Sequence, residues 1–577
     1  MRLKDLRGKI VLLDFWTFCC INCLHVLDEL RPFEEEFADV LVTIGVHSPK
    51  FVHEADADAL KAAVERYEVH HPVLDDPEMT SWQNYAVKAW PTLVLIDPEG
   101  YVVHVAAGEG HVAALTTIVR ELVGEHDAKG TLHRGDGPYV PPEPVATDLR
   151  FPAKVVVTPQ DTLLVTDNHS VVELAADGET VIRRFGDGTR GRRDGISPTF
   201  AEPAGITLLP NEIAEQVGYD AIVADTANHL LRGLNLSTGE VITVAGTGEQ
   251  WRDGPVAGPA LDVDLSSPWD VVWWRDGVIV AMAGNHTLGH FDPLQGKVSR
   301  FAGTTVEGLY DAPAKDAFFA QPSGLAADGD RLWLVDSETS ALRWLDDELN
   351  VHTAVGLGLF DFGHVDGDAE KALLQHPLGV AVLPDGSVAI ADTYNGAVRR
   401  YEPDTKQVST LATGIAEPSG IAVVDGKIAV VASAAHRIEF PVAPGDEQRV
   451  TGEAHQVKRP PTELKPGEVE LVVVFQPPPG TKLDERYGPS TRLEVTASPP
   501  ELLVGGAGVG TDLTRKITLA NVENGVLHVV AQAASCADDP AVEHPVCRLT
   551  RQDWGVPVNI TGSGPARLPL VMGGMDE

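Results

Sequence analysis

The feature that most constrains the fold is a repeat that fills the middle of the chain. A Pro-x-Gly element, or a close variant of it, recurs six times at intervals of 41 to 65 residues. The six copies begin at Pro152, Pro203, Pro268, Pro322, Pro377 and Pro418. Short alternating apolar runs and turn-forming residues follow each copy, enough for four strands. Four short strands at such a period predict a β-propeller of six blades.

Acidic residues recur at equivalent places in this repeat, where the second expected strand of a blade ends. They are Asp167, Asp225, Asp336 and Asp392. The same residue type returns in several blades, and Asp side chains bond nearby backbone groups, so we expect a structural role in turns. A calcium or zinc ion in the central channel is the alternative for these carboxylates, and catalysis by the propeller alone is a third.

Three of the five cysteines lie within ten residues near the N-terminus: Cys19, Cys20 and Cys23. An apolar run over Ile10–Phe15 predicts a buried strand before them, and helical spacing of apolar residues predicts a helix over Cys20–Phe37. Cys20 then stands at the helix N-terminus, where negative charge is stabilised, with Cys23 about one turn further along. This arrangement indicates Cys20 as a nucleophilic thiol and Cys23 as the resolving thiol.

The cysteines could also be inert core residues or belong to a metal site. Free cysteines pack like small hydrophobic residues, so they could be inert parts of the core. A zinc site normally needs four N or S ligands, and His25 is the only further candidate nearby. Attachment of a c-type haem would need histidine directly after the second cysteine, where this chain has Leu24.

The first 125 residues alternate strands with helices, which predicts an α/β domain over 1–125. Further strands are expected at Leu41–Val46, Leu93–Ile96 and Tyr101–Ala106, and further helices at Ala55–Arg66 and His111–Val123. His47, His70 and His71 have no nucleophile beside them in the sequence. We therefore expect them to be ordinary polar residues.

The remaining boundaries come from changes in composition. Residues 126–150 lose the periodicity and contain Pro141–Pro144, so they are expected to be a linker. The propeller would cover 151–450. Residues 454–563 have alternating strand patterns between proline-rich turns and no helical period, which predicts a β-sandwich-like domain. The strands are expected at Glu468–Phe475, Arg492–Ala497, Leu513–Leu519 and Val526–Ala531, and residues 564–577 are expected to be an irregular tail.

The charge balance argues against nucleic acid as a partner. The 577 residues carry a net charge of −39, with a pI of about 4.8, whereas nucleic-acid binding needs basic patches. The first residues lack a signal-peptide pattern, and no stretch of about 18 apolar residues could span a membrane. We therefore expect a cytoplasmic protein without membrane contact. In a reducing compartment, a lone Cys-x-x-Cys pair is more often catalytic or metal-binding than a structural bridge.

Two motifs resemble known families. Asp14-Phe15-Trp16 followed by Cys20-x-x-Cys23 resembles the active-site strand and helix of thioredoxin-like proteins. Trp90-Pro91-Thr92 resembles the cis-proline loop of that family. The resemblance implies that Asp14 is the buried acid that moves protons, and that the Trp90–Pro91 loop holds the substrate next to the sulfurs.

More narrowly, Cys19-Cys20-Ile21-Asn22-Cys23 and Gly45-Val46-His47-Ser48-Pro49-Lys50 resemble the NHL-repeat-containing thioredoxin-like proteins over nearly the whole chain. The blade repeat resembles the NHL type. Two features depart from well-known reductases: the dipeptide Ile21-Asn22 between the cysteines, and the extra thiol of Cys19.

Two functions follow as expectations. The first is a thiol–disulfide oxidoreductase that uses the dithiol without any cofactor and docks a protein partner through the propeller. The second is an interaction scaffold whose propeller binds a partner, with a redox-sensing or catalytically weak thioredoxin-like domain. The sequence identifies neither the substrate nor the electron donor nor the oligomeric state.

Cys536 and Cys547 flank an acidic loop in the last domain. They could form a structural bridge, exchange with Cys20 and Cys23, or stay unpaired. A β-sandwich with a cysteine pair on a loop loosely resembles the N-terminal domain of transmembrane thiol–disulfide interchange proteins, which relays electrons to thioredoxin-like partners. The resemblance makes Cys536 and Cys547, together with Cys19, candidate accessory thiols.

Overall fold

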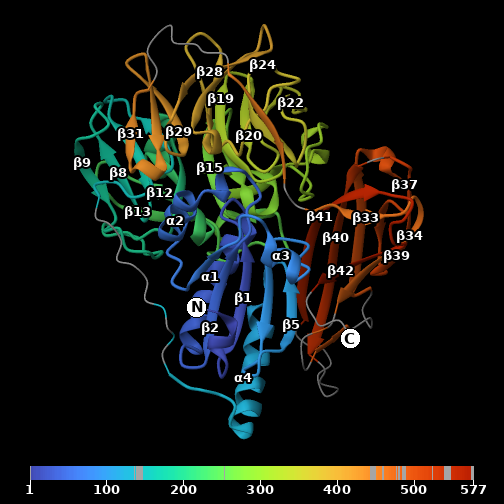
Figure 1. The fold of residues 1–577 in the computed structure, drawn as a ribbon. Coiled ribbons are helices and arrows are strands. Elements are labelled where there is room, and N and C mark those ends of the chain that lie inside the picture. Colours follow the sequence, from blue (N-terminus) through green and yellow to red (C-terminus); the bar gives the residue numbers. More distant parts are fainter. Residues whose placement is uncertain are drawn as a thin grey trace. The chain divides into compact units, whose positions relative to one another are not determined.

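The structure is a computed structural model (Figure 1). It describes residues 2–135, 137, 139, 147–252, 254–441, 450–457, 460–475, 477, 481–483, 489–522, 524–537 and 547–572. The chain divides into two compact units. One contains residues 1–50, 54–143 and 458–577, and the other contains residues 51–53 and 144–457. The proline-rich Pro141–Pro144 segment of the expected linker lies outside the described residues.

The N-terminal α/β domain (blue in Figure 1) is built on a five-stranded sheet in the order β3-β2-β1-β4-β5. Its strands are β1 (Ile10–Trp16), β2 (Leu41–His47), β3 (Val73–Asp75), β4 (Thr92–Ile96) and β5 (Val102–Ala107). Its helices are α1 (Ile21–Glu36), α2 (Ala57–Arg66), α3 (Thr80–Asn84) and α4 (Val112–Lys129). The central strand β1 pairs in parallel with β2 and antiparallel with β4.

The two faces of β1 bury different side chains, because successive residues of a strand point to opposite faces. Ile10 and Leu12 join an apolar cluster with residues of α1 and α4. Val11 and Leu13 join a second cluster that contains Trp82 of α3. Asp14 shares its face with Leu12, so the sequence places a carboxyl group on the side of the sheet that α1 covers.

Three features of this domain differ from the sequence-based expectation. The short elements β3 and α3 were not predicted, because three and five residues are too few to show a period. Helix α4 continues to Lys129, past the expected boundary at residue 125. It continues because Leu122 and His126 are still buried, and it ends at Gly130, whose φ of 70° suits a left-handed cap.

The second unit is a propeller (teal to orange in Figure 1), with six blades in the part of the chain that the structure describes. Blade 1 has β6 (Val155–Val157), β7 (Leu163–Asp167), β8 (Ser170–Leu174) and β9 (Val181–Phe185). Blade 2 has β10 (Pro203–Leu208), β11 (Ala221–Asp225), β12 (Leu230–Leu234) and β13 (Val241–Ala245), with helix α5 (Asn211–Val217) between its first two strands. Blade 3 has β15 (Pro268–Trp274), β16 (Gly277–Met282), β17 (Thr287–Asp292) and β18 (Lys297–Ala302), with β14 (Ala257–Pro259) at its edge.

Blade 4 has β19 (Pro322–Asp328), β20 (Arg331–Asp336), β21 (Ala341–Leu345) and β22 (Val351–Val355). Blade 5 has β25 (Gly379–Val382), β26 (Val388–Asp392), β27 (Ala397–Glu402) and β28 (Gln407–Thr413), with β24 (Gly367–Asp368) at its edge. Blade 6 has β29 (Pro418–Val424), β30 (Lys427–Ala432) and β31 (Arg437–Glu439), and a separate ribbon pairs β23 (Asp361–Val365) with β32 (Thr451–Gln456). The innermost strands β6, β10, β15, β19, β25 and β29 contact one another in a closed ring. The predicted six-bladed fold is confirmed.

The glycine of the Pro-x-Gly repeat is explained by this ring. A Cβ at Gly205 would lie 2.5 Å from Cα of Asp270 in the next blade, and one at Gly379 would lie 2.6 Å from the Ser419 carbonyl oxygen. Innermost strands therefore approach too closely for a side chain at this position. The two blades without glycine there carry Lys154 and Asp270, whose Nζ and Oδ2 atoms are 3.4 Å apart.

The recurring aspartates of the blades are buried, and three of the four pair with arginines of the third strands, whereas Asp167 pairs with Arg184 of β9. Nη1 of Arg232, Arg343 and Arg399 lies 2.6, 3.5 and 2.7 Å from Oδ2 of Asp225, Asp336 and Asp392. The same carboxylates accept backbone N–H groups from the loop that enters the blade. Their role is structural, as expected, but it joins strands and loops rather than only local turns.

The C-terminal domain (red in Figure 1) has two sheets. One contains β33 (Thr462–Leu464), β35 (Thr481–Leu483), β36 (Thr491–Ser498), β38 (Gly508–Gly510), β40 (Asn524–Ala537) and β41 (Cys547–Ile560). The other contains β34 (Gly467–Phe475), β37 (Leu503–Gly505), β39 (Thr514–Leu519) and β42 (Arg567–Met572). Alternate residues of both sheets, such as Leu527 and Leu471, share one apolar core. The predicted β-sandwich is therefore present.

The expectation of an irregular tail over 564–577 is wrong for its described part. Residues Arg567–Met572 form β42, which pairs in parallel with β34. Leu568, Leu570 and Met572 are at most 2% exposed, so the alternation was present in the sequence. Pro569 hid it, because proline is tolerated only at edge positions, and β42 is an edge strand.

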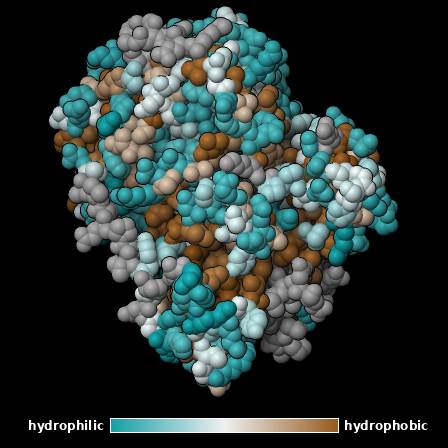
Figure 2. Space-filling view, in the orientation of Figure 1, coloured by the Kyte–Doolittle hydropathy of each residue, from teal (hydrophilic) through white to brown (hydrophobic). Residues whose placement is uncertain are grey.

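The molecular surface mixes polar and apolar side chains (Figure 2). In the α/β domain, the exposed large apolar residues include Leu3, Leu74, Tyr101 and Val102. Among the described residues, no helix has the length and apolar character needed to cross a bilayer.

Candidate active site

The dithiol lies at the start of α1. Cys20 is the N-cap residue, and the backbone N–H of Cys23 donates to its sulfur at 3.4 Å. Cys20 is partly exposed and Cys23 is completely buried, and both are free thiols. Burial, with a hydrogen bond to Cys20, raises the pKa of the Cys23 thiol well above its usual value. Cys20 is therefore the sulfur that a substrate can reach, and Cys23 needs a base before it can react.

A candidate for that base is Asp14 in the middle of β1. Its carboxyl group is fully buried, and neither oxygen has a hydrogen-bond partner among the described residues. Burial raises the pKa of Asp14 from 3.8 to about 7, with a smaller lowering by His71 and a smaller raising by Glu34. The charge of Asp14 in turn raises the pKa of Cys23, so the two groups lie close enough to interact. Near neutral pH, Asp14 can therefore both accept and give up a proton.

The Trp90–Pro91 loop is placed by the pairing of β1 with β4. Phe15 is in register with Thr92, so Pro91 directly precedes the strand that flanks the Asp14 strand. The Trp90–Pro91 peptide bond is cis, as the resemblance implies. The indole Nε1 of Trp90 donates to the Ser48 carbonyl at 2.9 Å, and the Gly108 N–H donates to the Pro91 carbonyl at 2.8 Å.

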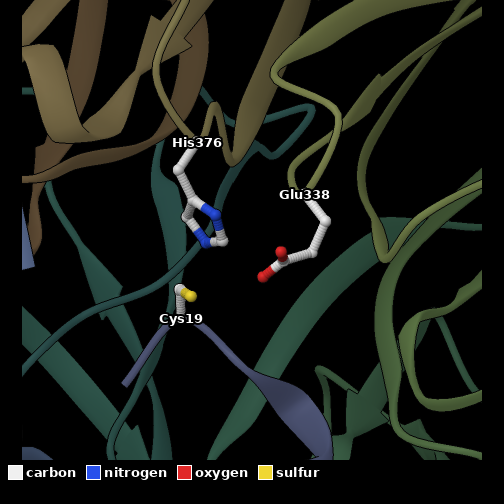
Figure 3. Close-up of side chains that lie close together, drawn as sticks. All are labelled: Cys19, Glu338 and His376. Atoms are coloured by element: carbon white, nitrogen blue, oxygen red, sulfur yellow. The ribbon is translucent and has the colours of Figure 1, made fainter. Parts of the chain in front are cut away.

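Cys19 is held in place through Glu54, a buried residue that the sequence did not single out. Glu54 Oε1 accepts from the Cys19 N–H at 2.9 Å and from the Thr17 hydroxyl at 2.6 Å. Its other oxygen accepts from the Lys50 N–H at 2.8 Å. Cys19, labelled in Figure 3, is only 1% exposed.

Two histidines that were expected to be ordinary polar residues are buried in this domain. His47 is in register with Trp16 and stacks on Phe18 with ring centroids 5.2 Å apart, and burial lowers its pKa to about 4. His71 is 8% exposed and pairs with Glu34. No local pattern signals these positions, because their neighbours come from distant parts of the chain.

The other two cysteines belong to the C-terminal domain. Cys536 is disulfide-bonded, and it is in register with Cys547 across β40 and β41. The acidic loop between the two residues, 538–546, lies outside the described residues. A bonded Cys536 agrees with the structural interpretation. Exchange of this pair with Cys20 and Cys23 stays a prediction.

Two parts of the structure could be expected to hold a metal ion: the group of Asp97, Glu99 and His126, and the ring of innermost strands. Asp97, Glu99 and His126 bring possible ligand atoms within 4.8 Å of one another, but Lys129 Nζ lies 3.5 Å from Glu99 and the Thr131 hydroxyl lies 2.7 Å from Nδ1 of His126. These groups already have internal partners.

In the ring of innermost strands, the ammonium group of Lys154 donates to the carbonyl oxygens of Ser323 and Leu378. The ammonium group of Lys154 thus already places a positive charge at this point of the ring.

His376 of the propeller, also labelled in Figure 3, stacks on Tyr394 with ring centroids 4.4 Å apart.

Comparison with known families agrees with this geometry. The Thioredoxin-like family model matches residues 8–102, which contain strands β1 to β4, the dithiol and the Trp90–Pro91 loop. The NHL repeat model matches residues 374–401, which lie in blade 5. The chain combines a thioredoxin-like domain with NHL repeats. The predicted family resemblance is thereby confirmed.

Two relatives match more than two thirds of this chain. The chain is 34% identical over 462 residues to the SUPPRESSOR OF QUENCHING 1 protein of Arabidopsis thaliana, described as chloroplastic, covering 73% of this chain and 43% of that protein. It is 36% identical over 453 residues to the human NHL repeat-containing protein 2, covering 71% of this chain and 61% of that protein. The matched region thus spans less than two thirds of these relatives.

Among solved structures, a streptogramin B lyase is similar to the NHL propeller region at 14% identity and a TM-score of 0.34. The match covers 54% of this chain and 95% of the lyase. A similarity this weak says nothing about activity.

Proposed function

We propose that the chain is a thiol–disulfide oxidoreductase that reduces a disulfide of a protein substrate. The observation that carries the proposal is the pairing of unlike thiols at the start of α1. Cys20 is partly exposed, and its sulfur accepts a hydrogen bond from the Cys23 N–H. Cys23 is buried and interacts with the carboxyl group of Asp14, whose pKa is about 7. Cys20 is thus placed to attack a disulfide, whereas Cys23 must be deprotonated by a base before it can react.

In the first step, the Cys20 thiolate attacks one sulfur of the substrate disulfide. A bond forms between Cys20 and that sulfur, the substrate S–S bond breaks, and the other substrate sulfur leaves as a thiolate that takes a proton from water. The backbone N–H of Cys23 donates to the Cys20 sulfur and holds it at the start of α1. The loop at Trp90 and Pro91 would hold the substrate backbone in the orientation for this attack.

In the second step, Cys23 resolves the mixed disulfide. Asp14 takes the proton from the Cys23 thiol, and the resulting thiolate attacks the Cys20 sulfur. The Cys20–Cys23 bond forms, the bond between Cys20 and the substrate breaks, and the second substrate thiolate leaves. Two electrons pass from the dithiol to the substrate. A small dithiol or a reduced dithiol protein must supply two electrons for the next turnover, and no metal or organic cofactor takes part.

The propeller would serve as the docking surface for a protein partner, because it makes up more than half of the chain and carries exposed apolar side chains. Its exposed apolar side chains include Ile196, Leu294, Tyr310 and Leu357. A propeller that only binds partners, with a weak or sensing dithiol, is the second candidate function. The departures at Cys19, Ile21 and Asn22 favour it.

Reduction of insulin by the full chain in the presence of dithiothreitol tests the proposal. We expect the wild-type chain to accelerate reduction and Cys20→Ser to return the rate to that of dithiothreitol alone. Cys19→Ser is the matched control, because Cys19 is buried and held through its backbone, and it should keep most of the activity. Equal rates for wild-type and Cys20→Ser chains would overturn the proposal and favour the scaffold.

A further inference from the structure

Several buried polar atoms beside the dithiol have no hydrogen-bond partner within the described structure. They are both carboxyl oxygens of Asp14, Nε1 of Trp16 and Nε2 of His71. Asp14 and Trp16 are completely buried and His71 is 8% exposed. Buried polar groups are nearly always satisfied, so a cluster of unpaired ones needs an explanation.

Two of these nitrogens lie beside Gly45. Gly45 of β2 is in register with Asp14 of β1. A Cβ at Gly45 would lie 2.9 Å from Trp16 Nε1 and 3.2 Å from His71 Nε2. Both nitrogens therefore come too close to the Gly45 backbone for even a methyl group to fit, next to the strand position that carries Asp14. A water shared by these unpaired atoms would have the two to four polar partners that a buried water needs.

His71 connects this space to the outside. Its other ring nitrogen, Nδ1, lies 2.8 Å from Oε1 of Glu34 on α1. The side chain of Glu34 is 23% exposed, whereas that of His71 is 8% exposed. Exposure therefore increases along the series Asp14, His71, Glu34. A carboxylate on Nδ1 also fixes the tautomer that leaves Nε2 free to accept a proton.

We propose that His71, held by Glu34, carries the proton of Asp14 to and from solvent through water beside Gly45. The inference rests on the proposed oxidoreductase function, because it concerns the proton that Cys23 gives up to Asp14 in the second step. His71 and Glu34 do not touch the reacting sulfurs, so they are positioning and relay residues for the acid–base group.

Each step of this relay transfers one proton. The Asp14 carboxylic acid gives its proton to the water, which gives one to Nε2 of His71. The imidazolium loses the proton on Nδ1 to the Glu34 carboxylate, and Glu34 releases it to solvent. The imidazole returns to its starting tautomer by ring reorientation or by the reverse transfer, and Asp14 is again a carboxylate that can accept the next proton from Cys23.

Few other titratable groups face Asp14. Helix α1 contributes Cys23 and Glu34, β2 contributes His47 two register pairs further along, and the segment before β3 contributes His71. The neighbouring strand β4 places Leu93 in register with Asp14. Burial lowers the pKa of His47 to about 4, so His47 stays neutral above pH 5 and does not compete as a carrier.

Single-turnover kinetics of the reduced full chain with a peptide disulfide test the relay. Quenched samples analysed by mass spectrometry separate formation of the mixed disulfide at Cys20 from its resolution by Cys23. We expect His71→Ala to leave formation unchanged and to slow resolution by roughly a hundredfold at pH 6, the lower end for a lost acid–base group. At this pH most Asp14 starts as the carboxylic acid and must lose its proton through His71 before it can accept the proton of Cys23. Added imidazole should restore much of the resolution rate, which a purely structural role of His71 would not allow.

Gly45→Ala is the second variant, because its methyl group would push Trp16 Nε1 and His71 Nε2 out of place without removing a titratable group. It should slow resolution and should not respond to imidazole. His70→Ala is the matched control, since His70 is an exposed neighbour, and it should behave like the wild type. If His71→Ala and Gly45→Ala resolve at the wild-type rate, or if imidazole has no effect on His71→Ala, the relay is wrong. A wild-type chain that forms no mixed disulfide at Cys20 would instead contradict the oxidoreductase function itself, and the relay with it.

Discussion

Single residues decide the chemistry of the thioredoxin-like domain, and Asp14 matters most. The apolar residues around Asp14 indicated a buried strand, and the expected role of Asp14 came from the resemblance. In the structure, the carboxyl group is fully buried with a pKa of about 7. A group so perturbed affects both reactivity and stability.

Asp14→Asn should stabilise the domain in a pH-dependent way. The folded pKa of about 7 lies above the value of 3.8 for an unperturbed carboxyl, so between these pH values the native state holds a proton that the unfolded state has lost. Stability of the wild type therefore falls as pH rises from about 4 to 7, by at most about 4 kcal/mol for a shift of about 3 units. Asp14→Asn removes this loss.

Hydrogen exchange of the β1 amides in the full chain measures this effect. Protection in Asp14→Asn should exceed that of the wild type at pH 8 and approach it near pH 4. The exposed Glu35→Gln serves as a control with no expected difference. Equal protection of wild type and Asp14→Asn at pH 8 would show that burial of Asp14 carries no such cost.

The site residues that the sequence missed share one property. Glu54 holds Thr17 and Cys19, and His71 pairs with Glu34, in each case across more than 30 residues of chain. Local motifs such as Cys20-x-x-Cys23 can be recognised because their chemistry lies within one helical turn. Contacts made by folding the sheet leave no spacing in the sequence, so these partners required the structure.

At the level of strands and blades, repetition made the propeller predictable. Each Pro-x-Gly copy marks an innermost strand, because glycine is needed where adjacent blades meet. The short elements β3 and α3, which have no repetition or period, were missed, and Pro569 hid the alternation of β42. The end of α4 was placed too early because helix boundaries depend on burial and on a capping glycine.

The buried Arg–Asp pairs of the blades should be essential to each blade that has one. Arg343 is completely buried, 3.5 Å from Asp336 and 2.8 Å from Asp311. Arg343→Met leaves Asp336 buried without its cation, which should lower the stability of the propeller by about 3–5 kcal/mol. Thermal unfolding of the full chain measures the shift.

Lys315→Met is the control for this substitution. Lys315 is 83% exposed and lies 4.0 Å from Asp316, near the same blade. Surface pairs contribute less than about 1 kcal/mol, so its unfolding curve should match the wild type. Similar shifts in unfolding temperature for Arg343→Met and Lys315→Met would mean that the buried Arg343–Asp336 pair stabilises the propeller no more than a surface pair does.

At the scale of the whole molecule, one ion pair links distant blades of the ring. Lys154 belongs to blade 1, and its ammonium group meets Asp270 of blade 3 and carbonyl oxygens of Ser323 and Leu378 in blades 4 and 5. Burial lowers the pKa of Lys154 and raises that of Asp270, so each group depends on the other to stay charged. Lys154 and Asp270, the two residues that replace glycine in the Pro-x-Gly repeat, thus form a single ion pair.

A double-mutant cycle with Lys154→Met and Asp270→Asn measures this coupling. Each single variant leaves one buried group unpaired and should lose about 3–5 kcal/mol. The double variant should lose less than the sum, by roughly 0.5–3 kcal/mol. Strictly additive losses would show that the two residues act independently.

The central claim is that Cys20 attacks a substrate disulfide and Cys23 resolves the product. The most direct measurement is trapping of the intermediate in Cys23→Ser, which can attack but cannot resolve. After incubation of the full chain with oxidised glutathione, peptide mass mapping should find glutathione on Cys20 in nearly all molecules, released by dithiothreitol. The wild type should instead contain a Cys20–Cys23 bond. Glutathione on Cys19, or no adduct on Cys20, would contradict the account.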